Sequence, residues 1–357
     1  MEASLSIVIP VYNGSRHIPQ LFDTLGRQNV LGTDTDIPVE VIMVDDGSID
    51  GTPEVIREYV AMYPNVRYLR QENSGQATAR NLGLDNARMK YVYMLDCDDI
   101  LVDDVLVPLV KRIEDDGSEV LRFKYVEVDS KDKGSLPKVD RSVSTMHTHV
   151  TDGIGFMLDS DCMRHEMNVW TSIFSVEFLR KRNLRFDARM RTNEDGIFNI
   201  SVMAVARRVS VCQLTGIYYI VYDDSNSHRR DREHEWSLRP SFVYFAEDLV
   251  PIIKRLQAGG VPDVIVAWLK ELQTRYTLFY WYAAFIWMPE SLDRVFKEID
   301  RQRRVSVLPA YPDCLPDKSL LRPHLILFKN LYLGMRHPSL LRMMFWVRGV
   351  LKSTSKK

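Results

Sequence analysis

The chain has 357 residues, of which 45% are hydrophobic and 27% are charged, and its formal net charge is −1. This composition excludes a disordered chain, and the charge near zero excludes a general electrostatic attraction to nucleic acid. No run of about 18 uncharged apolar residues is present, so a membrane-spanning helix is not expected.

The cysteines and the N-terminus bear on the compartment. Cys97, Cys162, Cys212 and Cys314 include no Cys-x-x-Cys pair, which indicates free thiols in a reducing environment. The opening MEASLSIVIPVYNG has no basic segment before its short apolar run, so a secretion signal is not expected. We therefore expect a cytoplasmic protein.

Short apolar runs alternate with helical patterns in the first hundred residues. This alternation predicts a mainly parallel α/β sheet with right-handed crossovers. The carboxyl ends of such strands share one edge, where ligands bind in open α/β sheets. The predicted strands cover 5–12, 39–46, 66–71 and 91–98, and the predicted helices cover 15–28, 50–63 and 74–88.

The later elements follow the same rules of periodicity. An Asp-capped helix is predicted over 103–117, a strand over 119–128, and helices over 175–186 and 193–208. Two strands, 209–214 and 216–222, are expected to flank a glycine turn. The polar stretch 129–145 is predicted to be an exposed excursion, and 223–235 a charged linker.

The character of the chain changes after this linker, which predicts an α/β domain over 1–230 and a helical C-terminal domain over 231–357. A long helix is expected over 262–288. Segment 320–357 is basic and contains no acid, with leucines between the basic positions. Peripheral contact with the inner face of a membrane is one interpretation, and a packed accessory helix with a charged outer face is the other.

Polar clusters follow each of the first four predicted strands: YNGS, DDGS, QENSG and DCDD. The last contains Asp96, Asp98 and Asp99 within four positions. Carboxylates this close repel one another, so a metal ion, a helix N-terminus or water must compensate their charge. Four polar clusters at one edge of a sheet indicate a ligand site more strongly than any single cluster.

The order of these motifs resembles that of the family 2 glycosyltransferases, which have the GT-A fold, over roughly residues 4–222. SIVIPVYNG, EVIMVDDGSIDGT, ENSGQATARNLGL, LDCDD and NEDGIF are similar to successive family segments. The resemblance implies an inverting, metal-dependent enzyme of the bacterial surface-glycan type. It would move a sugar from a nucleotide sugar, UDP-linked, to a hydroxyl of a glycan or lipid-linked glycan.

The resemblance places the metal at the Asp-x-Asp motif. Asp98 is the expected ligand, and Asp96 lies nearer the ribose or the metal-bound waters. The expected ion is Mn²⁺ or Mg²⁺, since hard cations prefer oxygen ligands and need few carboxylates. Asp99 is expected to cap the following turn, and the thiol of Cys97 to point into the core.

The resemblance also implies a nucleotide-sugar site. Asp46, supported by Asp45, suits the N3–H of uracil, and the ring of Tyr12 can stack on a base. Arg80 is expected to pair with these two acids or to reach the base. A turn with a helix cap remains an alternative for Asp-Asp-Gly-Ser. The full expected set is Pro10, Tyr12, Asn13, Asp45, Asp46, Gly75, Arg80, Asp96, Cys97, His228 and Arg229.

For catalysis, the resemblance assigns the general base to Asp195, with Glu194 as the neighbouring alternative. These acids equally suit the start of a helix. His228 and Arg229 belong either to a basic loop over the diphosphate or to a solvated loop. Trp170 suits either an acceptor cleft or the core.

The sequence leaves two alternatives to the transfer of a sugar. A sugar nucleotidyltransferase needs a glycine-rich, basic phosphate loop after the first strand, and PVYNGSRHI has one glycine and one arginine. A nucleotide-sugar-binding protein with little turnover is the second. The presence of Asp46, Asp96, Asp98 and Asp195 together disfavours it.

Overall fold

A computed structural model describes residues 3–139, 148–159, 168–222 and 237–287. The chain divides into two compact units, residues 1–229 and 230–357. The predicted linker 223–235, with His228 and Arg229, and the basic segment 320–357 lie outside the described residues.

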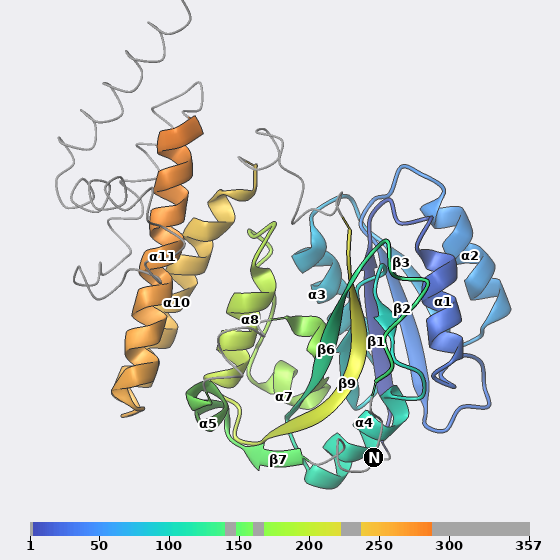
Figure 1. Ribbon diagram of the computed structural model, residues 1–357, viewed down its shortest axis with the longest axis horizontal. Coiled ribbons are helices and arrows are strands. Elements are labelled where there is room, and N and C mark those ends of the chain that lie inside the picture. The colour runs from blue at the N-terminus through green and yellow to red at the C-terminus, as the bar shows by residue number, and fades with distance from the viewer. Residues whose placement is uncertain (1–2, 140–147, 160–167, 223–236, 288–357) are drawn as a thin grey trace, which may run out of the picture. The chain divides into compact units, whose positions relative to one another are not determined.

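Within the described residues, the first unit is built on one nine-stranded sheet with the order β3-β2-β1-β4-β8-β6-β9-β5, and β7 pairs with β9 (Figure 1). The pairs among β1 to β4 are parallel, whereas β8 runs antiparallel to β4 and β6. The strands are β1 Leu5–Val11, β2 Val39–Asp45, β3 Val66–Arg70, β4 Tyr91–Met94, β5 Ile100–Leu101, β6 Val120–Asp129, β7 Thr148–Thr151, β8 Ser172–Ser175 and β9 Val209–Val221.

The prediction of a parallel sheet is thus confirmed for the first four strands, whose carboxyl ends share one edge. The second half of the sheet is mixed, because β8 is antiparallel to β4 and β6, whereas β6 and β9 are parallel. β1 and β2 are buried along their whole length, as their nearly continuous apolar sequences require.

Helices cover both faces of the sheet, with α1 and α2 on one face and α3, α7 and α8 on the other (Figure 1). Gly83 of α3 lies so close to the sheet that a Cβ there would be 2.2 Å from Cγ1 of Val8. Phe198 of α8 packs edge-on against Phe174 of β8. The helices are α1 Ile18–Gly26, α2 Thr52–Met62, α3 Gln76–Asn86, α4 Leu106–Asp116, α5 Gly153–Leu158, α7 Val176–Lys181 and α8 Glu194–Met203, with the 3₁₀ helix η1 at Val169–Thr171.

The prediction of two final strands that flank a glycine turn is wrong, because β9 runs unbroken through Gly216. A Cβ at this position would lie 2.6 Å from the ring of Phe123 on β6. The β6–β9 register shifts between Arg122 and Tyr125, which marks an irregularity in this pair. Glycine here permits a close approach of two strands.

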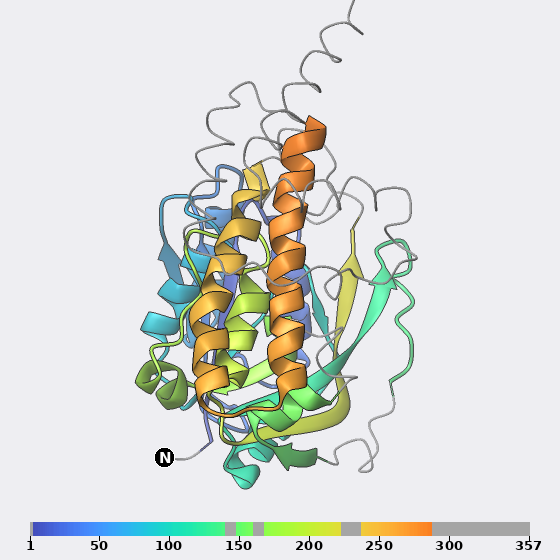
Figure 2. The same cartoon turned by 90° about the vertical axis from the view of Figure 1, so that its left-hand side faces the viewer.

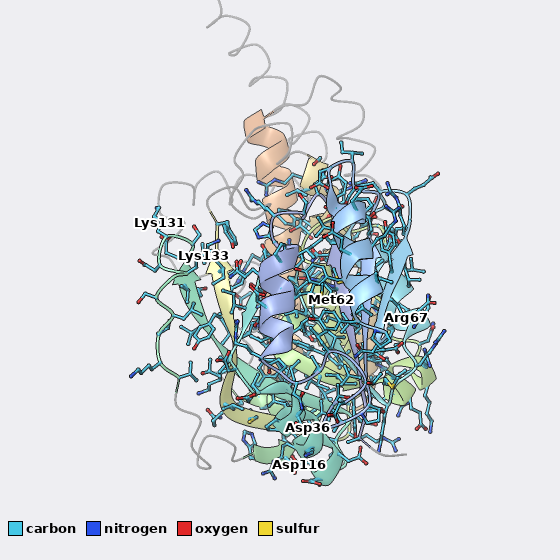
Figure 3. All side chains as sticks on the ribbon, turned by 90° about the vertical axis from the view of Figure 1, so that its right-hand side faces the viewer. Asp36, Met62, Arg67, Asp116, Lys131 and Lys133 are labelled. Carbon is cyan, nitrogen blue, oxygen red and sulfur yellow. The ribbon has the colours of Figure 1, made fainter. Side chains whose placement is uncertain are left out.

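The described part of the polar stretch 129–145 confirms the predicted excursion. Residues 131–135 are exposed, and Figure 3 labels Lys131 and Lys133 in this stretch.

The second unit contains α10 Pro240–Ala258 and α11 Asp263–Trp287, which lie side by side (Figures 1 and 2). The rings of Phe245 and Tyr276 stack 3.8 Å apart between them, and the Gln273 side chain donates to the carbonyl of Ala246. Helix α11 confirms the helix predicted over 262–288. Among the helices that the structure describes, none has the length and apolar character of a membrane span.

The prediction that an aspartate caps α4 is wrong, because Gln28, which follows the end of α1, takes that role. Its side-chain oxygen accepts from the backbone N–H groups of Val105 (2.9 Å) and Leu106 (3.2 Å), and its amide donates to the carbonyl of Val102 (2.8 Å). Gln28 is 1% exposed, so α4 begins on a buried cap supplied from 77 residues away.

We expect Gln28→Ala to lower the free energy of unfolding by about 2 kcal/mol, because buried backbone donors lose their acceptor. Denaturant unfolding of the variant measures the loss. The exposed Gln213→Ala on β9 is the matched control and should leave the free energy unchanged. Equal stability of both variants would contradict the capping role.

Candidate active site

Hydrogen bonds join the loops after β1 and β2 at the carboxyl edge of the sheet. Asn13 adopts φ 51°, and its side-chain oxygen accepts from the backbone N–H of Ile49 (2.9 Å). Its own N–H donates to Oγ of Ser48 (2.9 Å). Tyr12 is 49% exposed beside this junction, whereas Pro10 is a buried residue of β1. The ring of Tyr12 therefore faces solvent where the resemblance expects the nucleobase to bind.

Asp45 is fully buried at the end of β2 and holds two neighbouring segments. Its Oδ1 accepts from the N–H of Ser48 (2.8 Å), and its Oδ2 accepts from the hydroxyl of Tyr68 (2.8 Å). Arg70 lies 3.4 Å from Oδ2. Asp45 thus braces the turn after β2 against β3.

Asp46 holds the start of α3. Oδ1 accepts from Nε2 of Gln71 (2.7 Å) and from the N–H of Ser74 (2.8 Å), while Oδ2 accepts from the N–H of Gly75 (2.9 Å). Gly75 has φ 93°, a conformation that favours glycine. Both oxygens of Asp46 already accept protein hydrogen bonds, so the structure shows a capping role, and its contact with uracil stays a prediction.

An open hollow of about 520 Å³ lies next to these carboxylates. Residues of the turn after β2 and the segment after β3 line it. They are Gly47, Arg70, Gln71, Glu72 and Asn73.

The centre of the site is the guanidinium of Arg80, which is 1% exposed on α3. Nη1 donates to Oε1 of Glu194 (2.9 Å) and to Oδ1 of Asp195 (2.8 Å), and Nη2 donates to Oδ1 of Asp96 (2.9 Å). The expected pairing of Arg80 with Asp45 or Asp46 is therefore wrong. Arg80 instead joins the Asp-x-Asp motif to the Glu-Asp motif. Asp195 of the second motif lies 115 residues after Arg80 in the chain.

A second donor supports Asp96 from the same helix face. Nε2 of Gln76 donates to Oδ1 of Asp96 (2.9 Å). Gln76 and Arg80 are four residues apart on α3, a spacing that places two side chains on one face of a helix. This spacing was the sequence signal that could have identified Gln76, which the motif comparison missed.

The crowded carboxyl groups shift one another's pKa. Burial raises the pKa of Asp96 to about 6; Arg80 opposes this rise, and the charges of Asp195 and Asp98 add to it. Burial likewise raises the pKa of Glu194 to about 8, and the charge of Asp195 adds to it. Burial disfavours the charge on Arg80, but the three carboxylates outweigh burial and raise its pKa. Glu194 is therefore expected to hold a proton at neutral pH.

Asp195 is the more accessible member of the Glu-Asp pair. The prediction that these acids begin a helix is confirmed, since α8 starts at Glu194 after Asn193 at φ 62°. The side chain of Asp195 is 22% exposed against 6% for Glu194. Its Oδ1 is held by Arg80, and its Oδ2 lies 3.4 Å from the N–H of Val169. Oδ2 is thus the oxygen with the weaker hydrogen bond.

The other two aspartates of the DCDD cluster differ in how exposed their side chains are. Asp98 is half-buried, whereas Asp99 is 2% exposed, with its Oδ1 3.4 Å from the N–H of Ile220. The predicted capping role of Asp99 is wrong, because the chain enters β5 instead of a helix and carries Asp99 inside. Burial and the charges of Asp98 and Asp96 raise its pKa well above the ordinary value.

Cys97 packs under the loop after β1. A Cβ at Gly14 would lie 3.3 Å from its Sγ. The residue is half-buried against the hydrophobic core, and burial raises the pKa of its thiol well above the usual value. Its thiol is therefore a packing group, as predicted from the sequence.

Trp170 is buried, with 5% exposure, in η1. Its ring stacks on Tyr219 (5.0 Å, 11°) and meets Tyr125 edge-on (4.9 Å). One face of the indole is therefore covered, which favours the core over the acceptor cleft for Trp170. Tyr125 and Tyr219 come from β6 and β9, and the sequence comparison did not single them out.

The donor set suits a hard cation. Asp96, Asp98 and Asp99 concentrate negative charge, and the pKa of Asp99 is raised first by burial and then by the charges of Asp98 and Asp96. A divalent cation relieves such repulsion, and Mg²⁺ keeps several waters while it takes one or two carboxylates. Among the described residues, no three Asp, Glu, His or Cys side chains form a metal-binding group. The resemblance places the cation at Asp98, whereas Oδ1 of Asp96 accepts from Arg80 and Gln76.

Comparisons with known proteins give the family. The model described as glycosyl transferase family 2 matches residues 6–208. The chain is 28% identical over 233 residues to the glycosyltransferase EpsJ of Bacillus subtilis strain 168, an alignment that covers 62% of each chain. It is 24% identical over 230 residues to the poly(ribitol-phosphate) beta-N-acetylglucosaminyltransferase TarS of Staphylococcus aureus strain Mu50, which covers 64% of this chain and 36% of TarS. The chain spans less than two thirds of the length of these relatives.

A solved structure gives the fold. The crystal structure of S. aureus TarS 1–349 in complex with UDP-GlcNAc is similar with a TM-score of 0.60 and 20% identity, covering 98% of this chain and 92% of that chain. The sheet, the helices on both its faces and the acidic strand ends define a GT-A-like α/β protein. The chain belongs to glycosyl transferase family 2, whose model matches more than half of it.

The raised pKa of Glu194 makes a prediction for stability. Between pH 4.5 and about pH 8 the folded protein keeps a proton that the unfolded chain releases, so stability falls as pH rises, by up to about 1.4 kcal/mol per pH unit. Glu194→Gln has no such proton to lose. We expect denaturant unfolding to show that the variant gains stability relative to wild type from pH 5 towards pH 8.

The exposed Glu58→Gln on α2 is the matched control for this titration and should follow the wild-type curve. If the curves of Glu194→Gln and wild type run parallel over the same range, the folded protein does not hold the proton on Glu194.

Proposed function

We propose that the chain transfers a sugar, with inversion, from a UDP-sugar to a hydroxyl of a glycan or a lipid-linked glycan. The observation that carries the proposal is the guanidinium of Arg80, which binds Asp96 after β4 and Asp195 at the start of α8. It brings the donor-site motif and the expected base to one point. The names of relatives support the donor, since TarS is named a beta-N-acetylglucosaminyltransferase and its solved complex contains UDP-GlcNAc.

The base in this proposal is Oδ2 of Asp195. Arg80 holds Oδ1, so the second oxygen is the one left to take the proton of the acceptor hydroxyl. The acceptor oxygen then forms a bond to the anomeric carbon while the bond from that carbon to the diphosphate oxygen breaks. UDP leaves with the electron pair. One base and no covalent nucleophile give inversion.

Glu194 and Arg80 set the charge around this base. A protonated Glu194 adds no negative charge next to Asp195, which reduces the repulsion that a second carboxylate would cause. Arg80 keeps the base in place through a charge-assisted hydrogen bond that is shielded from water. In this proposal Glu194 is therefore a neighbour of the base and not the base itself.

Asp98 would hold Mn²⁺ or Mg²⁺, whose charge offsets the negative charge that grows on the leaving diphosphate. Asp96, bound by Arg80 and Gln76, would face the ribose side. Tyr12 at the junction of the first two loops would stack on uracil, with Asn13 and Gly75 shaping the loops around it.

The acceptor, the compartment and the C-terminal unit remain predictions. The name of TarS, which contains poly(ribitol-phosphate), supports a cell-envelope polymer as the acceptor class. A cytoplasmic enzyme, with its C-terminal unit at the acceptor or at the inner membrane face, fits such a polymer.

A screen of nucleotide sugars tests the donor. UDP-GlcNAc and other UDP-, GDP- and dTDP-sugars are incubated with the protein, with and without Mn²⁺, and released nucleotide is measured. We expect Mn²⁺-dependent cleavage of a UDP-sugar. Release of pyrophosphate from a nucleoside triphosphate would favour a nucleotidyltransferase, and UDP binding without any cleavage would favour a binding protein.

Two substitutions test the named residues. Asp195→Asn should lower kcat by about 100-fold or more, because the neutral amide cannot take the proton, while UDP affinity stays unchanged. Asp98→Ala should lower Mn²⁺-dependent cleavage by about 100-fold and remove the effect of Mn²⁺ on UDP affinity. The control is the exposed Asp115→Ala on α4, which should behave like wild type. Wild-type rates in both site variants would contradict the proposal.

A further inference from the structure

The base has a second contact, with the peptide group between Asn168 and Val169. The N–H of this peptide lies 3.4 Å from Oδ2 of Asp195, the oxygen assigned to take the proton. The carbonyl oxygen of the same peptide accepts from Nη1 of Arg122 (3.0 Å) and from Oγ1 of Thr171 (3.0 Å). Arg122 and Asp195 therefore bind the two ends of one planar peptide unit.

Arg122 is placed for this contact by the sheet. It lies on β6 opposite Ser172 of β8, and its Nη1 also donates to Oγ of Ser172 (2.7 Å). The residue is 2% exposed, and its guanidinium lies 5.7 Å from the centre of the Phe156 ring. Burying a guanidinium carries a desolvation cost that apolar side chains in the same place would avoid. The hydrogen bonds to the carbonyl of Asn168 and to Ser172 offset part of that cost.

The 3₁₀ helix η1 is fastened at a further point on the same side of the base. The carbonyl oxygen of Trp170 accepts from the hydroxyl of Tyr93 (2.9 Å), a buried residue of β4. The short helix is thereby tied to β6 through Arg122 and to β4 through Tyr93. A peptide held in this way presents its N–H in a fixed direction.

We propose that Arg122 is a positioning residue for the catalytic base, which it orients through the Asn168–Val169 peptide. The inference rests on the proposed function. A cation at the carbonyl oxygen polarises the amide and strengthens its N–H as a donor, since hydrogen bonds in a chain polarise one another. Because the peptide is planar, fixing its carbonyl also fixes the N–H that meets Oδ2 of Asp195. Arg122 thus acts on the reacting oxygen without contacting the substrate.

A double-mutant cycle with UDP-GlcNAc cleavage as the readout tests this role. Arg122→Met should lower kcat by about 10-fold or more in the wild-type background and by less than about 3-fold in the Asp195→Asn background, since coupled residues are non-additive. The affinity for UDP should stay within about 2-fold of wild type, because Arg122 acts on the base and not on the donor. Arg122→Lys keeps the charge and should recover part of the lost rate.

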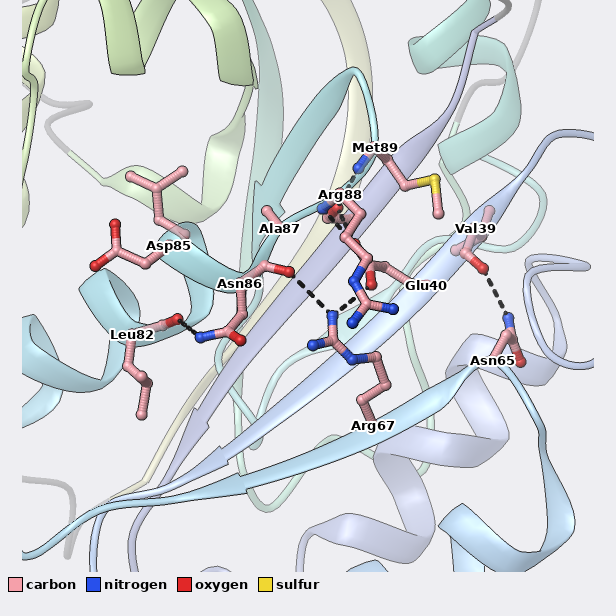
Figure 4. A network of polar contacts seen from close by, with 12 residues as sticks. Val39, Glu40, Asn65, Arg67, Leu82, Asp85, Asn86, Ala87, Arg88 and Met89 are labelled. Atoms are coloured by element: carbon pink, nitrogen blue, oxygen red, sulfur yellow. Dashed lines mark hydrogen bonds and ion pairs between the residues drawn. The ribbon is translucent and has the colours of Figure 1, made fainter.

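The matched control is Arg67→Met at the opposite edge of the sheet. Arg67 also donates to a backbone carbonyl, that of Asn86 (3.0 Å), and it pairs with Glu40 (2.7 Å), as Figure 4 shows. This variant should lose stability but keep the wild-type kcat. If Arg122→Met does not fold, Tyr93→Phe removes the bond to Trp170 and should show the same non-additivity with Asp195→Asn, at a smaller size.

Additive effects of Arg122→Met and Asp195→Asn, or a kcat equal to wild type, would overturn the positioning role and leave the proposed function standing. A wild-type protein that cleaves no nucleotide sugar would instead remove the proposed function and this inference with it.

Discussion

The buried guanidinium of Arg80 is the interaction on which the site depends. It donates to Glu194, Asp195 and Asp96 from a helix that covers one face of the sheet. Breaking a buried ion pair by removing one partner is strongly destabilising, because the remaining charges lose their compensation. The same contact that holds α8 against α3 therefore also sets the position of the expected base relative to the Asp-x-Asp motif.

Charge balance follows from this arrangement. One guanidinium meets three carboxyl groups, and the pKa values of Glu194 and Asp96 rise as a result of burial and repulsion. The proton expected on Glu194 makes the cluster less negative, and a cation at Asp98 would do the same on the donor side. The peptide held by Arg122 meets Oδ2 of Asp195, the expected base. The carboxylates of this site are thus arranged by arginines on two different elements.

The sequence predicted those parts of the molecule that depend on local pattern. The apolar runs of β1 to β4 identified the strands, their order placed the polar clusters at one edge, and the acids at 194 and 195 marked the start of α8. It did not predict β8, because Ser172–Ser175 is short and takes its antiparallel place only between β4 and β6. The partners of Arg80 and the cap of α4 by Gln28 were missed for the same reason. Their contacts join residues that are far apart in the chain, and no local spacing reveals them.

The most direct test of the account is the steady-state kinetics of Arg80→Lys with the UDP-sugar that the wild-type protein cleaves. An ammonium group is a point charge and cannot donate in a fixed fork to three carboxylates. The account predicts a folded variant, checked by circular dichroism, whose kcat/KM falls by about 100-fold or more, with both UDP affinity and kcat reduced. A folded Arg80→Lys variant with kcat/KM within about 3-fold of wild type would contradict the claim that this guanidinium assembles the site.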